Sequence, residues 1–416
     1  MSNDLIDRFL GSVIKQGQLT LSLPSGKVHT IGQPAEGFPN VAITLKDNKV
    51  ARDILLDPRL GAGEAYMEGR IIIDEGDVMQ LVQLLRANKP WERGGRLKSP
   101  SFFSSLKSRA KFMRASFNEA TSSKRNVAHH YDIGNDLYNL MLDPEHMQYS
   151  CAYWADGVTD LSGAQEAKLA HIAAKLALKP GQKVLDIGCG WGGMAIYLAR
   201  HFDVEVTGIT LSEEQLALAR RRAEDAGVSG KVRFELIDYR VLAEQGQRFD
   251  RIVSVGMFEH VGRPQFEAFF RATANLLNDD GVMLLHTIGR FGGPGVTDAF
   301  TSKYIFPGGY IPALSETLAA SEKYRLIHTD IETLRLHYAK TLRAWYAKCE
   351  QHKDAIIDLF DERFYRMWTF YLSGATAAFE SGGMGNYQIQ FARNRHALPI
   401  TRDYMADTEQ ELLKGA

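Results

Sequence analysis

Two polar residues interrupt apolar runs that otherwise have the pattern of buried strands. Glu259 follows the run in "FDRIVSVGMFEHVG", and His286 lies near the end of the run in "GVMLLHTIG". Burying a carboxylate is costly unless it has a partner, so Glu259 needs a contact or a chemical role. Ligands bind outside the carboxyl ends of parallel strands, so both side chains are expected to point into one crevice and to belong to a binding or catalytic site. His260 has no second observation in its support and is interpreted as structural.

A glycine-rich turn supplies the second chemical signal. In "VLDIGCGWGG", residues 184–193, an apolar strand leads into glycines and then into a helix. Gly188, Gly190 and Gly193 fit the spacing of a dinucleotide fingerprint, which would also need an acidic residue at the end of the next strand. That strand, in "VEVTGITLSEEQ", ends in Thr210. The turn therefore predicts a ligand that approaches the backbone closely but is not a dinucleotide.

The three cysteines, Cys151, Cys189 and Cys349, support neither a disulfide framework nor a metal site, because they share no ligand spacing. A reducing cytoplasm fits this usage. Cys151, in "YSCAYW", could be read as a nucleophile, but no base adjoins it in sequence. Its thiol is interpreted as a bystander.

The elements that must position these residues alternate along most of the chain. From about residue 125 onward, strand-like runs alternate with helix-like runs, which predicts a parallel sheet with helices on both faces. Residues 1–90 instead combine short strands with the helix-like "DVMQLVQLLRANKP", which predicts a small α+β domain. A length of 416 residues also favours two domains. The expected limits are 1–90, a linking segment over 91–124, and 125–416.

Charge and hydropathy exclude some functions. The net charge of −1 does not favour a nucleic-acid partner, and no run of about 18 apolar residues could span a membrane. From Arg93 to Arg125, however, the sequence contains nine basic residues and only one acidic residue, and aromatic residues lie between them. This segment is either a contact with an anionic lipid surface or a solvated linker between domains.

The wider motifs point to one family. "AHHYDIGNDLYNLMLDPEHMQYSCAYW", "TGITLSEEQ", "DRIVSVGMFEHVG", "LLHTIG", "KYIFPGG" and "TLRAWY" occur in this order, and "VLDIGCGWGG" carries Asp186 before its glycines. From residue 125 to 395 the chain thereby resembles the cyclopropane-fatty-acyl-phospholipid synthases and their mycolic-acid relatives. Residues 1–90, with "GEAYMEGR", resemble the N-terminal domain of the bacterial phospholipid enzymes less specifically.

The resemblance implies a seven-stranded Rossmann-like class I methyltransferase domain that binds S-adenosyl-L-methionine. Tyr149 and Ser150 would contact its methionine end, Thr210, Ser212 and Gln215 the ribose, and Asp238 and Tyr239 the adenine. Ser212 could equally cap a helix, and the two roles are compatible. The glycine turn would wrap the cofactor with Leu185, Asp186, Ile187, Gly188, Cys189, Gly190, Trp191, Gly192 and Gly193.

The resemblance also implies the reaction. A methylene group would pass from S-adenosylmethionine to the cis double bond of unsaturated phospholipid acyl chains and form a cyclopropane ring. Bound bicarbonate would act as the base, held by Glu259, His286, Tyr338 and main-chain groups of Cys151 and Ile288. Glu259 would then orient the base and not itself abstract the proton. The enzyme would be cytoplasmic, associated peripherally with the inner membrane surface, with a homodimer as one compatible assembly.

Three readings stay open on the sequence alone. The first is cyclopropanation, and the second is methylation of the same alkene without ring closure or of an amine by a related enzyme. The third is a non-catalytic lipid-binding protein. The intact glycine turn and the complete set of Glu259, His286, Tyr338 and Cys151 disfavour the third reading.

Overall fold

The computed structural model describes residues 2–95 and 134–414 and divides them into two compact units. The first, here called the α+β unit, contains residues 2–95, 297–307 and 342–384. The second, the α/β unit, contains residues 134–296, 308–341 and 385–414. The basic segment predicted over 93–125 lies outside the described residues from residue 96 onward. The predicted domain limits of 1–90, 91–124 and 125–416 stay a prediction.

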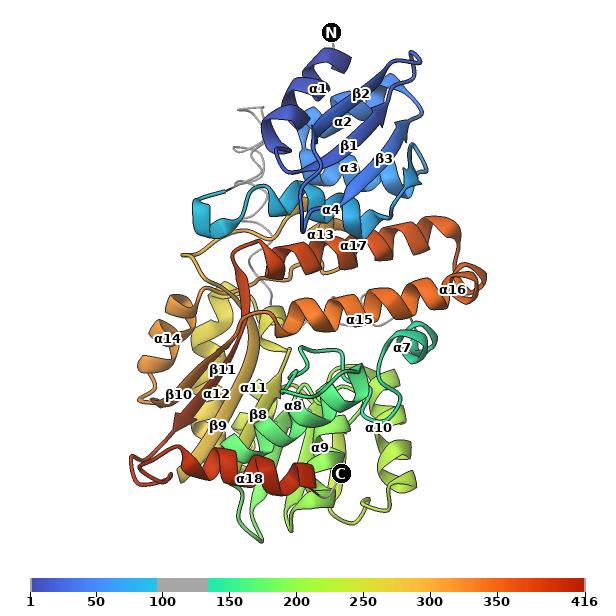
Figure 1. The fold of residues 1–416 in the computed structure, drawn as a ribbon. Coiled ribbons are helices and arrows are strands. Elements are labelled where there is room, and N and C mark those ends of the chain that lie inside the picture. The colour runs from blue at the N-terminus through green and yellow to red at the C-terminus, as the bar shows by residue number, and fades with distance from the viewer. Residues whose placement is uncertain (1, 96–133, 415–416) are drawn as a thin grey trace. The chain divides into compact units, whose positions relative to one another are not determined.

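The α+β unit is built on a four-stranded sheet in the order β2-β1-β3-β4 (Figure 1). β1 pairs with β2 in the antiparallel sense and with β3 in the parallel sense. β1 and β3 alternate between buried and partly buried residues, so one face of the sheet packs on the helices. The elements are α1 (Ser2–Val13), β1 (Gly17–Ser22), β2 (Val28–Gln33), β3 (Asn40–Leu45), α2 (Asn48–Leu56), α3 (Pro58–Met67), β4 (Ile71–Glu75), α4 (Val78–Ala87) and the 3-10 turn η1 (Trp91–Arg93).

Later segments of the chain complete the same unit. They are α13 (Ala299–Tyr304), most of α15 (His337–Gln351), α16 (Lys353–Leu359) and α17 (Glu362–Glu380). α17 packs against α3 and α4, and Phe370 of α17 contacts the rings of Tyr66 and Phe300. The apolar face of α17 is therefore covered by residues that precede it by about 300 positions.

The α/β unit contains the predicted seven-stranded sheet, in the order β10-β11-β9-β8-β5-β6-β7. β5, β6, β7, β8 and β9 form parallel pairs, and β10 runs antiparallel to β11. The strands are β5 (Lys183–Ile187), β6 (Glu205–Thr210), β7 (Val232–Leu236), β8 (Phe249–Val255), β9 (Leu277–Arg290), β10 (Ile327–Leu334) and β11 (Met384–Ala392). The fold class expected from the sequence, including the small N-terminal α+β part, is confirmed.

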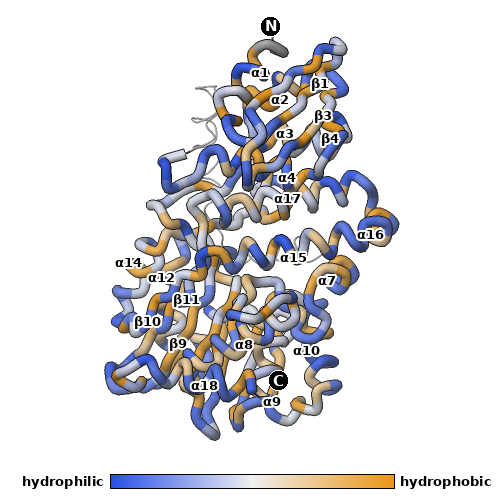
Figure 2. The backbone as a smooth tube through the Cα atoms, in the orientation of Figure 1, coloured by the Kyte–Doolittle hydropathy of each residue, from blue (hydrophilic) through white to orange (hydrophobic). Residues whose placement is uncertain are grey.

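Helices cover both faces of this sheet. α8 packs against β8 and β9, α18 packs on α8, and α12 lies on the opposite face (Figure 1). β9 is buried along Val282–Leu285, and its tube is coloured as hydrophobic in Figure 2. The helices are α7 (Asn135–Met141), α8 (Leu161–Leu176), α9 (Gly193–His201), α10 (Glu213–Asp225), α11 (Tyr239–Glu244), α12 (Phe266–Leu276), α14 (Leu314–Glu322) and α18 (Asp403–Lys414), with 3-10 turns η2 (Phe258–His260) and η3 (Arg263–Gln265).

Within the part of the chain that the structure describes, each helix is too short or too polar to cross a bilayer.

Candidate active site

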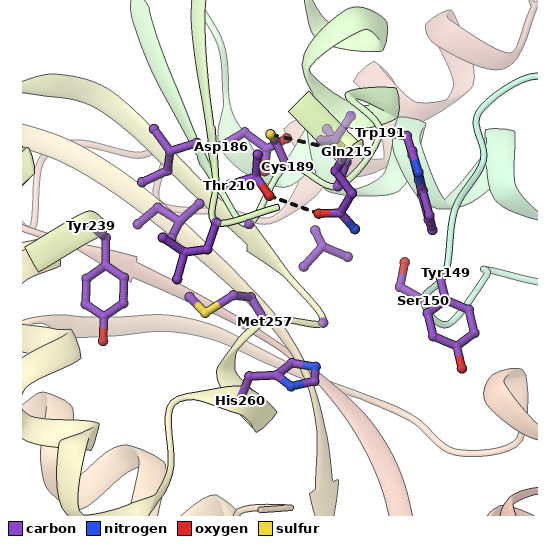
Figure 3. Close-up of a pocket in the computed structure, with 18 of the residues that line it drawn as sticks. Tyr149, Ser150, Asp186, Cys189, Trp191, Thr210, Gln215, Tyr239, Met257 and His260 are labelled. Atoms are coloured by element: carbon purple, nitrogen blue, oxygen red, sulfur yellow. Dashed lines mark hydrogen bonds between the residues drawn. The ribbon is translucent and has the colours of Figure 1, made fainter. Parts of the chain in front are cut away.

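A pocket open to solvent lies at the carboxyl ends of β5, β6, β7 and β8 (Figure 3), and the empty space of about 1100 Å³ in and around it includes its open mouth. This is the edge where ligands bind in parallel sheets. Twelve of the predicted cofactor residues line it: Tyr149, Ser150, Asp186, Ile187, Gly188, Cys189, Gly190, Trp191, Thr210, Gln215, Asp238 and Tyr239. In Figure 3, Tyr239 lies on one side of the pocket, and Tyr149 and Ser150 lie on the other.

Four predicted cofactor residues lie behind this lining. Leu185 is buried within β5, and Gly192 and Gly193 pack against Phe234 and the carbonyl oxygen of His146. Ser212 caps α10, where its hydroxyl accepts from the backbone N–H of Gln215 at 3.3 Å. These residues shape the pocket wall from behind.

The turn after β5 needs glycine for conformational reasons. Gly188 has φ +81° and Gly190 has φ +54°, a region that other residues rarely adopt. A Cβ atom at Gly188 would lie 2.7 Å from the side chain of Met257. The backbone N–H groups of Gly188 and Cys189 both donate to the carbonyl oxygen of Ile209, so β6 fixes the turn. The result is a backbone cradle that a ligand can approach closely.

Asp186 lies at the base of this cradle and is 2% exposed. Its Oδ2 atom is buried and has no hydrogen-bond partner within the described part of the chain. Burial raises the pKa of Asp186 to about 7, although nearby Lys168 opposes this. A buried carboxylate oxygen that lines the pocket suits a cationic ligand group, such as the ammonium of a methionine moiety. This observation fits S-adenosylmethionine.

Two other polar pairs shape the same pocket. The Thr210 hydroxyl donates to Gln215 Oε1 at 2.9 Å, which joins the end of β6 to α10 (Figure 3). Asp238 begins α11 and accepts from Arg240 Nε and Nη2 at 2.8 and 2.7 Å. Arg240 also lies over the ring of Tyr239. Asp238 therefore already has a cationic partner.

Glu259 lies in η2, directly after β8. Its Oε1 atom accepts from the backbone N–H of Ile288 on β9 at 2.6 Å. The other carboxylate oxygen, Oε2, is buried and lacks a hydrogen-bond partner among residues 2–95 and 134–414. Burial raises the pKa of Glu259 to about 7. The Ile288 N–H, expected to hold an anion, is thus used by Glu259, and an acceptor is left at Oε2.

His286 lies two residues before Ile288 on β9 and is 1% exposed. Its Nε2 and Nδ1 atoms lie 2.9 and 3.1 Å from the side-chain amides of Asn386 and Gln388 on β11. Burial holds the pKa of His286 well below its usual value, so the ring is neutral and has one N–H. Because Asn386 and Gln388 occupy both ring nitrogens, His286 could hold an anion only by giving up one of these amides.

The segment that carries Cys151 is hydrogen-bonded to the start of α15, the helix that carries Tyr338. The backbone N–H of Ala152 and the indole N–H of Trp154 both donate to Thr341 Oγ1 at 3.1 Å. Tyr338 is buried one turn earlier in α15. Burial raises the pKa of the Cys151 thiol, which lies 3.3 Å from the carbonyl oxygen of Ala152. A protonated thiol is a poor nucleophile, in keeping with its interpretation as a bystander.

Several site residues were missed by sequence reasoning. His260 lines the pocket with Met257, and burial lowers the pKa of His260 to about 4, so its ring is neutral. Its interpretation as structural therefore overlooked its place in the pocket wall. Asn386 and Gln388 had a readable signal, since polar residues alternate along the buried strand "GNYQIQ".

Among the described residues, no cluster of three or more His, Cys, Asp and Glu side chains could hold a metal ion.

Comparison with known proteins agrees with this site. The mycolic acid cyclopropane synthetase family matches residues 118–389. A cyclopropane-fatty-acyl-phospholipid synthase from Escherichia coli is 40% identical over 365 residues, which cover 87% of this chain and 90% of that protein. A probable fatty acid methyltransferase from Pseudomonas putida is 36% identical over 88% of this chain and 92% of its own length.

A solved mycolic acid cyclopropane synthase, in complex with SAH and CTAB, superposes with a TM-score of 0.60 at 34% identity. The superposition covers 65% of this chain and 98% of that structure. A pocket built on a glycine turn at the sheet edge, together with matches of this extent, places the chain in the mycolic acid cyclopropane synthetase family, as an S-adenosylmethionine-dependent methyltransferase.

Proposed function

We propose that the enzyme transfers a methylene group from S-adenosylmethionine to the cis double bond of an unsaturated phospholipid acyl chain and forms a cyclopropane ring. The observation that carries this proposal is the extent of the match to the Escherichia coli phospholipid synthase. It covers 87% of the chain and therefore includes part of residues 1–95, whereas the match to a mycobacterial cyclopropane mycolic acid synthase covers 62% of the chain. This difference favours a phospholipid substrate.

When bound, S-adenosylmethionine supplies the electrophilic methyl group, and bicarbonate supplies the base. Asp186 would accept from the ammonium of the methionine end, and Thr210 and Gln215 would contact the ribose. The positive charge that develops on the substrate needs a dry pocket, because water would quench it. The apolar side chains of Met257, Val255 and Val261 line the pocket and would help to keep water from the reacting carbons.

Glu259 suits the role of orienting the base. Its Oε1 atom accepts from the backbone N–H of Ile288, which orients the carboxylate, and Oε2 would accept from the hydroxyl of a bicarbonate ion. Tyr338 would donate to the same anion, together with the backbone N–H of Cys151. His286 would join them only after exchange of an amide partner.

A second candidate is methylation of the same alkene without ring closure. It is favoured by the similarity to a probable fatty acid methyltransferase, which extends over 88% of the chain. Both reactions would use the same pocket and acyl chain. Amine methylation and lipid binding without catalysis have no comparable support.

Peripheral contact with the inner membrane surface and a homodimeric assembly belong to this proposal too. The membrane contact would be made by the basic segment of residues 93–125, because each cation near an anionic lipid surface contributes about 1 kcal/mol.

Mass spectrometry of phospholipid fatty acids from cells that express the protein tests the proposal. A gain of one CH₂ with no loss of unsaturation equivalents is expected, and proton NMR should show cyclopropane protons. Cells that express Glu259→Gln serve as the control. A product of the same mass that shows vinylic or methylene protons and no cyclopropane protons would instead establish the second candidate.

A further inference from the structure

A buried ammonium group lies behind the cofactor pocket. Lys168, on α8, is 0% exposed and is not used by the reaction described above. Its Nζ atom donates to Gln148 Oε1 and, at 3.0 Å, to Ser150 Oγ. Lysine is rarely buried completely, because its charge must be compensated by acceptors. Gln148 and Ser150 line the pocket, whereas Lys168 does not.

The direction of these hydrogen bonds has a consequence for the pocket. An ammonium group can only donate, so Ser150 Oγ and Gln148 Oε1 must both act as acceptors toward Lys168. The Ser150 hydroxyl proton is then directed away from Lys168. The Gln148 amide nitrogen is likewise left as the donor end, with one bond to the carbonyl oxygen of His146 at 3.2 Å. The side chains of Ser150 and Gln148 can each donate or accept a hydrogen bond. Because Lys168 occupies their acceptor atoms, both present donors to the pocket.

The same helix also holds the backbone of this segment. Gln165, three residues before Lys168, donates through Nε2 to the carbonyl oxygens of Ser150 and Gln148 at 3.1 and 3.3 Å. Gln165 is 0% exposed. Segment 148–150 is therefore fixed by α8 through both its side chains and its carbonyl groups.

The charges at this end of the pocket are paired in a specific way. Lys168 provides a buried amino group beside Ser150 that carries its positive charge below a pKa that burial lowers to about 7, and Asp186 provides a carboxylate whose Oδ2 atom is unpartnered among described residues. An amino-acid moiety carries one carboxylate and one ammonium. The Ser150 and Gln148 donors, which lie beside the Lys168 cation, suit the carboxylate, and the Asp186 oxygen suits the ammonium.

We infer that Lys168 is a positioning residue that makes the pocket selective for the carboxylate of the cofactor's methionine moiety, acting through Ser150 and Gln148. This inference rests on the proposed function only in assigning the pocket to S-adenosylmethionine.

The test compares two ligands and three variants by calorimetry. One ligand is S-adenosylhomocysteine, and the other is its decarboxylated analogue, 5′-(3-aminopropyl)thioadenosine. Lys168→Met keeps the length of the side chain and removes its charge and donors. Lys175→Met is the matched control, because Lys175 is buried on the same helix but pairs with Glu332 and Asp330.

Lys168→Met should weaken S-adenosylhomocysteine binding about 10- to 100-fold, the range of a lost charge-assisted hydrogen bond, and change binding of the analogue less than about twofold. Lys175→Met should leave the ratio of the two affinities unchanged. Ser150→Ala keeps Lys168 in place and, like Lys168→Met, should lower the affinity for S-adenosylhomocysteine relative to that for the analogue. If Lys168→Met does not fold, the test uses Ser150→Ala instead.

Equal weakening of both ligands in Lys168→Met and Ser150→Ala would show a merely structural role and overturn the inference. So would unchanged binding of both ligands. If the wild-type protein binds neither ligand, the proposed function itself fails, which is a different result from the loss of selectivity.

Discussion

Replacing Glu259 with Gln should stabilise the protein at alkaline pH while it removes activity. Burial raises the pKa of Glu259 from 4.5 to about 7, which corresponds to about 3 kcal/mol. The folded state therefore binds this proton more tightly than the unfolded state does. The stability that this protonation provides is complete below pH 4.5 and is lost as the pH rises through about 7. Glutamine has the same size and no charge, so it avoids this loss.

Urea unfolding of wild type and Glu259→Gln, at about pH 4.5 and about pH 8, measures the effect. The unfolding free energy of wild type relative to the variant should fall by about 3 kcal/mol between these two pH values. Glu267→Gln is the control, since Glu267 is an exposed partner of Lys323 and should show no such change. Subtraction of the variant removes the contributions of other titrating groups.

Turnover of Glu259→Gln should fall on the order of 10²-fold, because the anion loses its charged acceptor. Affinity for S-adenosylhomocysteine should stay near that of wild type, because Glu259 is absent from the residues described as lining the cofactor pocket. A pH-independent difference in stability would refute the burial argument. A fully active variant, or turnover that added bicarbonate changes in neither protein, would refute the assigned role.

Three further results are expected. Asp186→Ala should weaken S-adenosylhomocysteine binding about 10-fold or more in calorimetry, because a buried charged acceptor is lost, and an unchanged affinity in a folded variant would contradict the assigned pocket. Replacing the four basic residues within 107–114, which lie outside the described part of the chain, with Gln should reduce co-sedimentation with anionic vesicles. High salt should reduce the co-sedimentation of wild type in the same way. Equal binding of variant and wild type would show that the segment is only a linker. Burial lowers the pKa of His171, but its hydrogen bonds to Glu332 and Glu409 outweigh this effect and the net pKa is raised. The stability that the charged ring contributes is therefore complete below the usual pKa of 6.5 and is lost as the pH rises through the raised pKa. Hydrogen-exchange protection of α18, which carries Glu409, should therefore fall with rising pH in wild type and not in His171→Gln, and parallel behaviour of the two proteins would exclude His171 as the cause.

The sheet could be predicted from sequence because each of its central strands is an apolar run that ends at a polar or glycine residue. Glu259 was recognisable because it interrupts such a run, whereas Asp186 was assigned through the resemblance of its glycine motif. β10 and β11 lack such an apolar run. Every second residue of β10 is exposed, and β11 buries the polar residues Asn386 and Gln388. Their place beside β9 depends on pairing over long sequence distances, which local periodicity does not encode.

The bond between Glu259 and the Ile288 N–H could not have been predicted either. It depends on how far β9 extends past β8, and this register is set by the packing of the two strands. The two amides around His286 likewise belong to a strand about 100 positions away. Sequence patterns identified the polar groups that matter, and tertiary contacts decided which of their atoms stay open to a ligand.

The interleaving of the two units along the chain has a consequence for how the protein is made on the ribosome. α3 and α4 are synthesised early, but α17, which packs against them, emerges only after strands β5 to β10. β11, the neighbour of β9, is synthesised after α17. Neither unit can therefore be completed before translation nears its end, and the usual order of one finished domain after another does not apply. A nascent chain stalled before residue 362 would display the apolar faces of α3 and α4 to chaperones.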